Sequence, residues 1–283
     1  MTAVLISLLA SICWGCADFA GGLYSRRVNV LTVLMIVEGV GLLLMITVGV
    51  VSGDPIPGHA ALLNAAAAGI SGVAGLGLFY RALAVGTMSI VAPVAASGAA
   101  LPALYGVLRG DAMSVLLAVG LVVAMAGVVL SSLEAEHEAG AAAPRSSARV
   151  SLVLAGCAAV GFGGYFILFD RISDDDSVFW AVAAARATPV ALLALALVVT
   201  GSRLPQGRDR LALAATGAVD AAATVLYGVA LTRGSLSVVS VVGSLYPVTT
   251  VLLARVVLAE RVRAVQGAGI VLALTGVALI SAG

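Results

Sequence analysis

The chain has 283 residues, of which 61% are hydrophobic and only 10% are charged, and its net charge is +1. A soluble domain carries about 25% charged residues, so this chain has too few polar side chains to cover a water-facing surface. The near-zero net charge argues against nucleic acid as a partner. The composition therefore predicts a multi-pass membrane protein whose main partner is the lipid bilayer.

Ten apolar stretches are long enough to cross a bilayer, which requires about 20 residues at 1.5 Å per residue. They cover residues 2–23, 29–51, 61–80, 87–108, 112–132, 149–169, 177–200, 211–231, 235–257 and 263–281. Helices are required, because an open strand in lipid leaves backbone groups unpaired, and these runs lack the alternation of a barrel strand. The sequence therefore predicts an all-α polytopic membrane protein with ten transmembrane helices.

Two features interrupt the predicted helices. A break between spans runs from Arg81 to Gly86, after the third stretch. Pro93 and Pro247 lie inside the fourth and ninth stretches, where a proline frees a backbone carbonyl. We expect each proline to kink its helix or to line a cavity.

The two halves of the chain repeat each other at a spacing of 148 residues. The matching pairs include Gly53 with Gly201, Pro57 with Pro205, Gly69 with Gly217, Gly86 with Gly234, and Ser89 with Ser237. Each half holds five predicted spans, an odd number, so the second half enters the bilayer from the opposite face. We predict two inverted five-helix repeats, residues 1–132 and 149–283, joined by a flexible linker at 133–148. The usual use of this geometry is alternating access around a central site.

Charged residues inside the spans are the strongest functional candidates, because charge is costly in lipid and is usually functional or paired there. Glu38 and Arg186 are repeat mates at equal depth, so a two-fold axis in the membrane plane can bring them together. One interpretation is an ion pair that fixes the packing of the halves. Asp220 is the repeat mate of Gly72, so symmetry offers it no counter-charge.

Asp18 is the fourth intramembrane charge, and its approximate repeat mate is Phe166. A carboxyl buried without a partner binds a cation, exchanges a proton or stays neutral by hydrogen bonding. Trp14 and Tyr246 also lie well inside their spans, where each needs a polar partner or a wet cavity. We therefore predict these substrate-binding residues: Trp14, Asp18, Glu38, Arg186, Asp220 and Tyr246.

Enzyme and metal chemistry find little support in the sequence. Gly69-Ile70-Ser71-Gly72 has the pattern of an intramembrane serine protease, but such a serine needs a base, and His59 and His137 both fall in loops. Cys13 and Cys16 have a redox spacing without the surrounding βαβ pattern. We expect no enzymatic activity, no catalytic residues, no metal and no cofactor.

Short motifs in both halves carry a family resemblance. The first half contains Trp14-Gly15, Asp18-Phe19, Ser25-Arg26-Arg27, Tyr80-Arg81-Ala82-Leu83 and Val91-Ala92-Pro93-Val94. The second half contains Ala230-Leu231, Gly234, Leu245-Tyr246-Pro247-Val248-Thr249-Thr250, Leu258-Ala259-Glu260 and Gly276-Val277. The ordered set resembles the ten-span, EamA-type members of the drug/metabolite transporter superfamily over nearly the whole chain. The resemblance implies two inverted repeats around a shared cavity and transport of small metabolites, often outward.

We therefore expect a multi-pass transporter of the plasma membrane that exports a small organic metabolite, such as an amino acid or a drug-like compound. Proton coupling is an open option, and the sequence does not fix the oligomeric state. One alternative is a lipid-headgroup translocase, which would show a lateral opening and an apolar groove. Another is a non-transporting membrane scaffold, in which all intramembrane charges pair and no central cavity exists.

The orientation of the chain has two conflicting predictions. Most arginines fall on the side where the first span exits, namely Arg26, Arg27, Arg81, Arg145, Arg149, Arg203, Arg208, Arg210, Arg255, Arg261 and Arg263. The positive-inside rule makes that side cytoplasmic. The family resemblance implies the opposite, with cytoplasmic termini. Both predictions place the two termini on the same face of the membrane.

Overall fold

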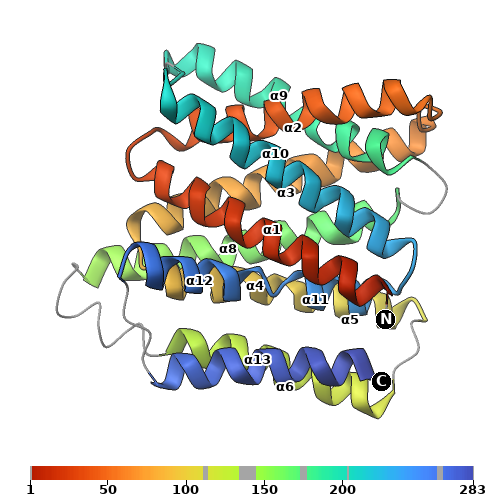
Figure 1. Cartoon of the computed structure of the whole chain (residues 1–283), viewed down its shortest axis with the longest axis vertical. Coiled ribbons are helices and arrows are strands. Elements are labelled where there is room, and N and C mark those ends of the chain that lie inside the picture. Colours follow the sequence, from red (N-terminus) through yellow and green to blue (C-terminus); the bar gives the residue numbers. More distant parts are fainter. Residues whose placement is uncertain are drawn as a thin grey trace.

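The computed structural model describes residues 2–110, 114–133, 145–172, 177–202, 204–259 and 264–282. The regular secondary structure in these ranges is entirely helical, which confirms the predicted all-α class (Figure 1). The first half contains α1 (Thr2–Ser25), α2 (Val30–Ser52), α3 (His59–Val85), α4 (Met88–Ala96), the 3₁₀ helix η1 (Ser97–Ala99), α5 (Ala100–Leu108) and α6 (Val115–Leu133). The second half contains α8 (Arg145–Asp170), α9 (Val178–Thr200), α10 (Arg208–Leu231), α11 (Leu236–Gly243), α12 (Tyr246–Val257) and α13 (Ala264–Ala282).

Eight helical segments within the described ranges are long and apolar enough to cross a membrane, where the sequence predicts ten. Two of the eight are composite, because α4, η1 and α5 form one segment and α11 and α12 form another. α6 adds a shorter apolar stretch, Ala118–Gly127, and packs along α13 at one edge of the bundle (Figure 1). The chain is thus a multi-pass, all-helical membrane protein.

The structure differs from the prediction at two of the expected helix interruptions. α3 continues through Arg81 to Val85, because a long arginine side chain near a helix end reaches the surface without breaking the helix. Pro247 does not kink a continuous helix: α11 ends at Gly243, and Pro247 sits in the first turn of α12, where its missing N–H has no intrahelical partner to lose. In the predicted linker, residues 134–144 lie outside the described ranges, and α8 already begins at Arg145.

α2 and α9 have the same length and the same terminal chemistry at the 148-residue spacing. Asn29 caps the start of α2 by accepting a hydrogen bond from the Leu31 N–H, and Ser177 caps α9 in the same way. Both helices end at a left-handed glycine, Gly53 with φ 71° and Gly201 with φ 62°. Such a glycine is the usual helix stop, since it lacks the Cβ that this conformation disfavours. Local sequence therefore fixes both ends of both helices.

The ends of α2 and α9 also contact each other, which makes the two helices antiparallel neighbours. The Asn29 amide donates to Ser202 Oγ, just after α9, at 3.5 Å. The Ser177 hydroxyl donates to Asp54 Oδ2, just after α2, at 2.5 Å. The start of each helix therefore lies beside the end of the other.

Two glycines let α3 and α10 pack closely against these central helices. A Cβ at Gly69 of α3 would collide with the Ala185 carbonyl oxygen of α9. A Cβ at Gly217 of α10 would lie 2.6 Å from the Val37 carbonyl oxygen of α2. Small residues allow this backbone approach, which replaces the hydrophobic effect as a source of packing in lipid.

The surface and the chain ends fit a bilayer protein. Large apolar side chains point outward on several helices, including Leu43, Val51, Val198 and Val256, which are 68–81% exposed. The start of α1 and the end of α13 lie at the same end of the bundle, as both orientation predictions require (Figure 1). α8 begins at the opposite end from α1 (Figure 1).

Candidate substrate site

A cavity of about 90 Å³ lies between α1, α2, α3, α8, α9, α10 and α12. All six residues predicted from the sequence line it: Trp14, Asp18, Glu38, Arg186, Asp220 and Tyr246. A buried water needs roughly 10–15 Å³ of such space, so the cavity has room for several waters or a few atoms of a solute. Helices from both halves of the chain therefore meet around one cavity that contains buried charged residues.

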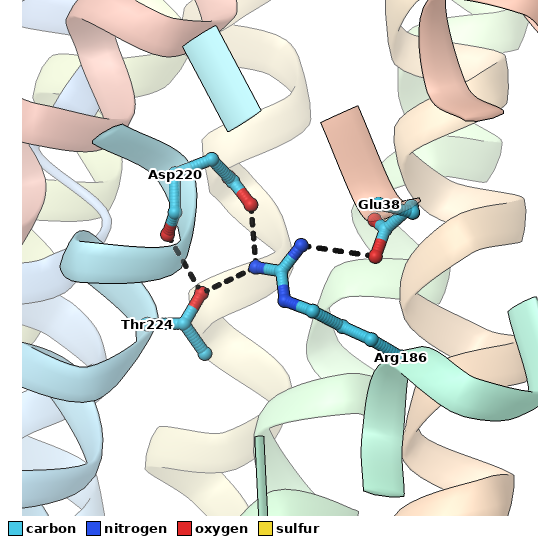
Figure 2. Close-up of polar contacts among 4 residues, drawn as sticks. All are labelled: Glu38, Arg186, Asp220 and Thr224. Carbon is cyan, nitrogen blue, oxygen red and sulfur yellow. Dashed lines mark hydrogen bonds and ion pairs between the residues drawn. The ribbon is translucent and has the colours of Figure 1, made fainter. Parts of the chain in front are cut away.

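Arg186 of α9 forms the centre of a buried charge network (Figure 2). Its Nη1 donates to Glu38 Oε2 at 3.0 Å, and its Nη2 donates to Asp220 Oδ2 at 2.6 Å. The three residues are only 6–8% exposed. The predicted approach of Glu38 and Arg186 is confirmed, and the two residues are separated by the 148-residue repeat spacing.

The prediction that Asp220 has no counter-charge is wrong. Its repeat mate Gly72 carries no charge, but Arg186 reaches Asp220 from α9. A guanidinium presents five N–H donors in a planar fork, so one arginine can serve two carboxylates at once. A repeat pairs residues one to one and therefore does not indicate such a shared partner.

Two neighbours hold the guanidinium in place. Thr224, one turn after Asp220, accepts a hydrogen bond from Arg186 Nη2 at 3.1 Å and donates to the Asp220 carbonyl at 3.0 Å. Gly41 of α2 leaves the space that the guanidinium fills, since a Cβ there would lie 2.7 Å from Nη1. The Arg186 Nε–H is buried and has no partner among the described residues. One donor of the network therefore stays available.

Asp18 stands apart from this network. It is 6% exposed, and no hydrogen bond or ion pair reaches its carboxyl from the part of the chain that the structure describes. It lines the central cavity together with Tyr246 of α12. The Tyr246 hydroxyl is itself buried without a partner within the described ranges. The wall near Asp18 thus offers a carboxyl and a hydroxyl that the protein leaves unpaired.

Aromatic rings form much of the remaining wall. Trp14 lies 5.9 Å from Phe166 between ring centroids, and Tyr165 lies 5.6 Å from Phe166 in an edge-on arrangement. Phe162 meets Tyr246 edge-on at 6.4 Å. Such rings offer apolar contact and electron-rich faces that attract cations.

Sequence reasoning missed several residues of the site, chiefly Gly41 beside the guanidinium and the lining residues Thr224 and Pro189. None of them is charged, so only the repeat could have drawn attention to them: Gly41 and Pro189 are mates at the 148-residue spacing. The serine of the protease-like pattern, Ser71, donates to the Gly161 carbonyl at 2.8 Å and joins α3 to α8. His137 lies outside the described residues.

The chain matches the model of the EamA-like transporter family over residues 1–133 and 149–282. It belongs to the EamA-like transporter family. The family match spans both halves, and it makes the protein a membrane transporter of the drug/metabolite kind. No curated protein matches the chain. A crystal structure of another protein shares the fold, with a TM-score of 0.75 and 21% identity, over 99% of this chain and 97% of the other.

Proposed function

We propose that this EamA-like transporter exports a small organic metabolite across the plasma membrane by alternating access, with proton coupling. The substrate passes through the central cavity, and the six residues predicted from the sequence bind it. The observation that carries the proposal is a cavity in which Asp18 and the Glu38–Arg186–Asp220 network face one space. Charges this costly are kept inside a membrane for pairing, binding or proton transfer.

The proposal includes ten spans arranged as two inverted repeats, residues 1–132 and 149–283, around a linker at 133–148. Its support is that contacts occur twice with the halves exchanged. Gly69 meets Ala185 as Gly217 meets Val37, and all four fit the 148-residue spacing. The cross-contacts between the ends of α2 and α9 are exchanged in the same way.

A two-fold axis across the helices would relate these contacts. A residue and its repeat mate touch only where they lie beside such an axis. Glu38 and Arg186 are such a pair, at 3.0 Å. The cavity therefore sits at the centre of the proposed pseudo-symmetry, where a rocking motion of one half against the other would expose it to each side in turn.

The unpaired groups of the cavity suit a solute with an ammonium and an acceptor oxygen, as in an amino acid. Asp18 and the Tyr246 hydroxyl can receive ammonium N–H bonds, and the Arg186 Nε–H can donate to a carboxylate. Among the lining residues, three carboxylates face one guanidinium, so the cavity needs added positive charge, from the solute or from a proton. The aromatic wall would contact the rest of the solute.

The alternative, a non-transporting membrane scaffold, predicts that all intramembrane charges pair and that no central cavity forms. The unpaired Asp18 and the cavity beside it favour transport instead. The test compares metabolites in the medium of cells that produce the wild type, Asp18→Asn or no protein. We expect one or a few metabolites to accumulate with the wild type and to fall well below the wild-type level with Asp18→Asn.

The matched control is Asp209→Asn, the same change in the first turn of α10 and away from the cavity. It should export like the wild type at equal membrane abundance. Identical media from wild-type and empty cells would contradict the transport proposal. Wild-type export by Asp18→Asn would remove Asp18 from the site.

A further inference from the structure

Five buried side-chain atoms in the described ranges have no hydrogen-bond partner in the protein. Two of them, Arg186 Nε and the Tyr246 hydroxyl, belong to residues of the central cavity. The other three are the hydroxyls of Ser25, Thr32 and Tyr80, on α1, α2 and α3. A buried hydroxyl without a partner is destabilising unless water or a ligand reaches it.

Two of these hydroxyls follow one face of α1 away from the cavity. Asp18 lines the cavity, and Tyr80 packs its hydroxyl against Gly21, where a Cβ would collide with it. Ser25 follows one turn later. Steps of three and four residues keep Asp18, Gly21 and Ser25 on the same helix face, and seven residues of helix span about 10 Å. The Tyr80 hydroxyl therefore lies beside α1 about one turn beyond Asp18.

The face ends in a second pocket, of about 320 Å³, at the end of the bundle where α1 stops. Ser25, Val28, Asn29, Val30 and Arg81 line it. Asn29 and Arg81 are exposed, so this pocket belongs to the surface. The oxygens of Asp18, Tyr80 and Ser25 therefore follow one another from the central cavity to the surface pocket, at steps of about one turn of α1.

Two of the equivalent positions in the second half carry apolar rings. Phe166 stands at the place of Asp18. The contact of Tyr80 with Gly21 is replaced by a contact of the fully buried Phe169 with Gly228, and these residues are the mates of Gly21 and Tyr80. A phenylalanine has no hydroxyl to hold water or pass a proton.

We propose that the α1 face from Asp18 to Ser25, together with Tyr80, is the route by which protons reach Asp18 from the membrane surface where α1 ends. Water in the surface pocket gives a proton to the chain of hydroxyls and waters. Each hydroxyl accepts one proton and passes on another, and the last proton neutralises the Asp18 carboxylate. The inference rests on the proposed proton coupling and gives it a single entrance.

Other titratable groups line the cavity with Asp18 or pack along the same face of α1. They are Tyr80 of α3, Glu38 of α2, Tyr165 of α8, Asp220 of α10 with its partner Arg186 of α9, and Tyr246 of α12. Arg186 already neutralises part of the charge on Glu38 and Asp220. Asp18 is therefore the carboxyl of this group that has no cationic partner among the described residues.

The first test measures water access without any substrate. In a protein whose Cys13, Cys16 and Cys157 are replaced by alanine, Ser25→Cys is compared with Ser7→Cys. Ser7 lies on the same helix, is fully buried, and donates its hydroxyl to the Val239 carbonyl at 2.8 Å. An impermeant thiol reagent added at the α1 end should modify Ser25→Cys at least about tenfold faster, because thiol reactivity follows exposure. Equal rates would overturn the route.

The second test follows the protonation of Asp18 by infrared difference spectroscopy after a drop in pH, with the band assigned by its loss in Asp18→Asn. Tyr80→Phe should slow proton uptake about tenfold, since the ring stays and only the relay hydroxyl is removed. Tyr227→Phe is the matched control, because that buried hydroxyl is bonded to Ser240 at 2.8 Å and lies outside the route. An unchanged rate in Tyr80→Phe, or an Asp18 band that does not respond to pH, would overturn the proposal. Export in the metabolite assay can persist in either case, which separates this inference from the proposed function.

Discussion

The two halves of the chain agree in the ends and the packing of their central helices, and they differ in the side chains that face the cavity. The agreement is close along α2 and α9, whose caps, lengths and glycine stops coincide at the 148-residue spacing. The agreement extends to Gly69 and Gly217, which allow α3 and α10 to pack closely against α9 and α2. These positions are set by backbone geometry, which tolerates little change once two helices touch.

The differences concentrate at the polar groups. Glu38 forms an ion pair with its own repeat mate, Arg186. The repeat mate of Asp220 is Gly72, and the repeat mate of Asp18 is Phe166. A strictly symmetric cavity would place like charges against each other on the axis, and like charges at this distance repel. The exchange of one charge sign turns that repulsion into an ion pair. Repeat mates therefore agree where helices pack closely, and they differ where charged groups line the cavity.

The largest effect is expected from removing the cation that the two halves share. Arg186→Met leaves Glu38 and Asp220 buried without their partner, and breaking a buried pair in this way costs about 3–5 kcal/mol. Thermal unfolding in detergent, with membrane abundance measured alongside, checks it.

The control for this change is the neutral triple variant Glu38→Gln, Arg186→Met and Asp220→Asn. It leaves no uncompensated charge, so most of the lost stability should return while transport stays absent. A single Arg186→Met variant as stable as the wild type would show that the network does not hold the halves together.

The next largest effect concerns the matched glycines. Gly69→Ala and Gly217→Ala each force a methyl group against a backbone carbonyl, and such overpacking costs about 1–3 kcal/mol. Gly39→Ala is the control, because no atom lies within 4 Å of a Cβ there, and it should not destabilise. Unfolding temperatures of the three variants measure the difference. A large loss at only one of the matched positions would break the proposed symmetry of packing.

The bounds of the central helices were predictable from the sequence, because they depend on local residues that occur in both halves. Predicted spans 29–51 and 177–200 nearly coincide with α2 and α9, since caps and glycine stops are written in the chain itself. The Glu38–Arg186 pair followed from the repeat. The end of α3 was not predicted correctly, because Arg81 looks like a break in hydropathy but is tolerated near a helix end.

The site was predictable as a set of residues but not as a set of bonds. All six candidates line the cavity, because an intramembrane charge or a deep aromatic residue is unusual enough to be noticed one at a time. The bond from Arg186 to Asp220 depends on how far α9 and α10 are rotated and on the reach of the arginine, which neither spacing nor composition encodes. Thr224 and Gly41 were missed for the same reason, since their role exists only beside the guanidinium.

A smaller effect separates the two aspartates that lack charged repeat mates. Asp220→Asn keeps an acceptor for Arg186 but loses the charge, which should cost about 1–2 kcal/mol, since charged hydrogen bonds are roughly that much stronger. Asp18→Asn loses no bond in the described protein, so it should cost less stability but should abolish the response of transport to pH. The sign follows from charge: acid adds a proton to wild-type Asp18 and weakens its hold on an ammonium, whereas the amide cannot change.

Transport in proteoliposomes at acidic and neutral pH, with the exported metabolite as substrate, measures this contrast. The wild type and Asp220→Asn should both respond to pH, and Asp18→Asn should not. A response lost in Asp220→Asn and kept in Asp18→Asn would exchange the roles that we assign to the two carboxyls.

The smallest effect concerns the N-terminal caps of α2 and α9, whose contacts with the other helix differ slightly in strength. Asn29→Ala and Ser177→Ala each remove a helix cap, which costs about 0.5–1 kcal/mol. Ser177→Ala should cost more, because its hydroxyl also donates to the Asp54 carboxylate at 2.5 Å, whereas the Asn29 amide reaches Ser202 only at 3.5 Å, the outer limit of a hydrogen bond. Unfolding in detergent measures both losses, and Asp54→Asn should reproduce only the excess at Ser177. Equal losses at the two caps would mean that the contact with Asp54 adds nothing, and that the two caps are as symmetric in their energies as in their geometry.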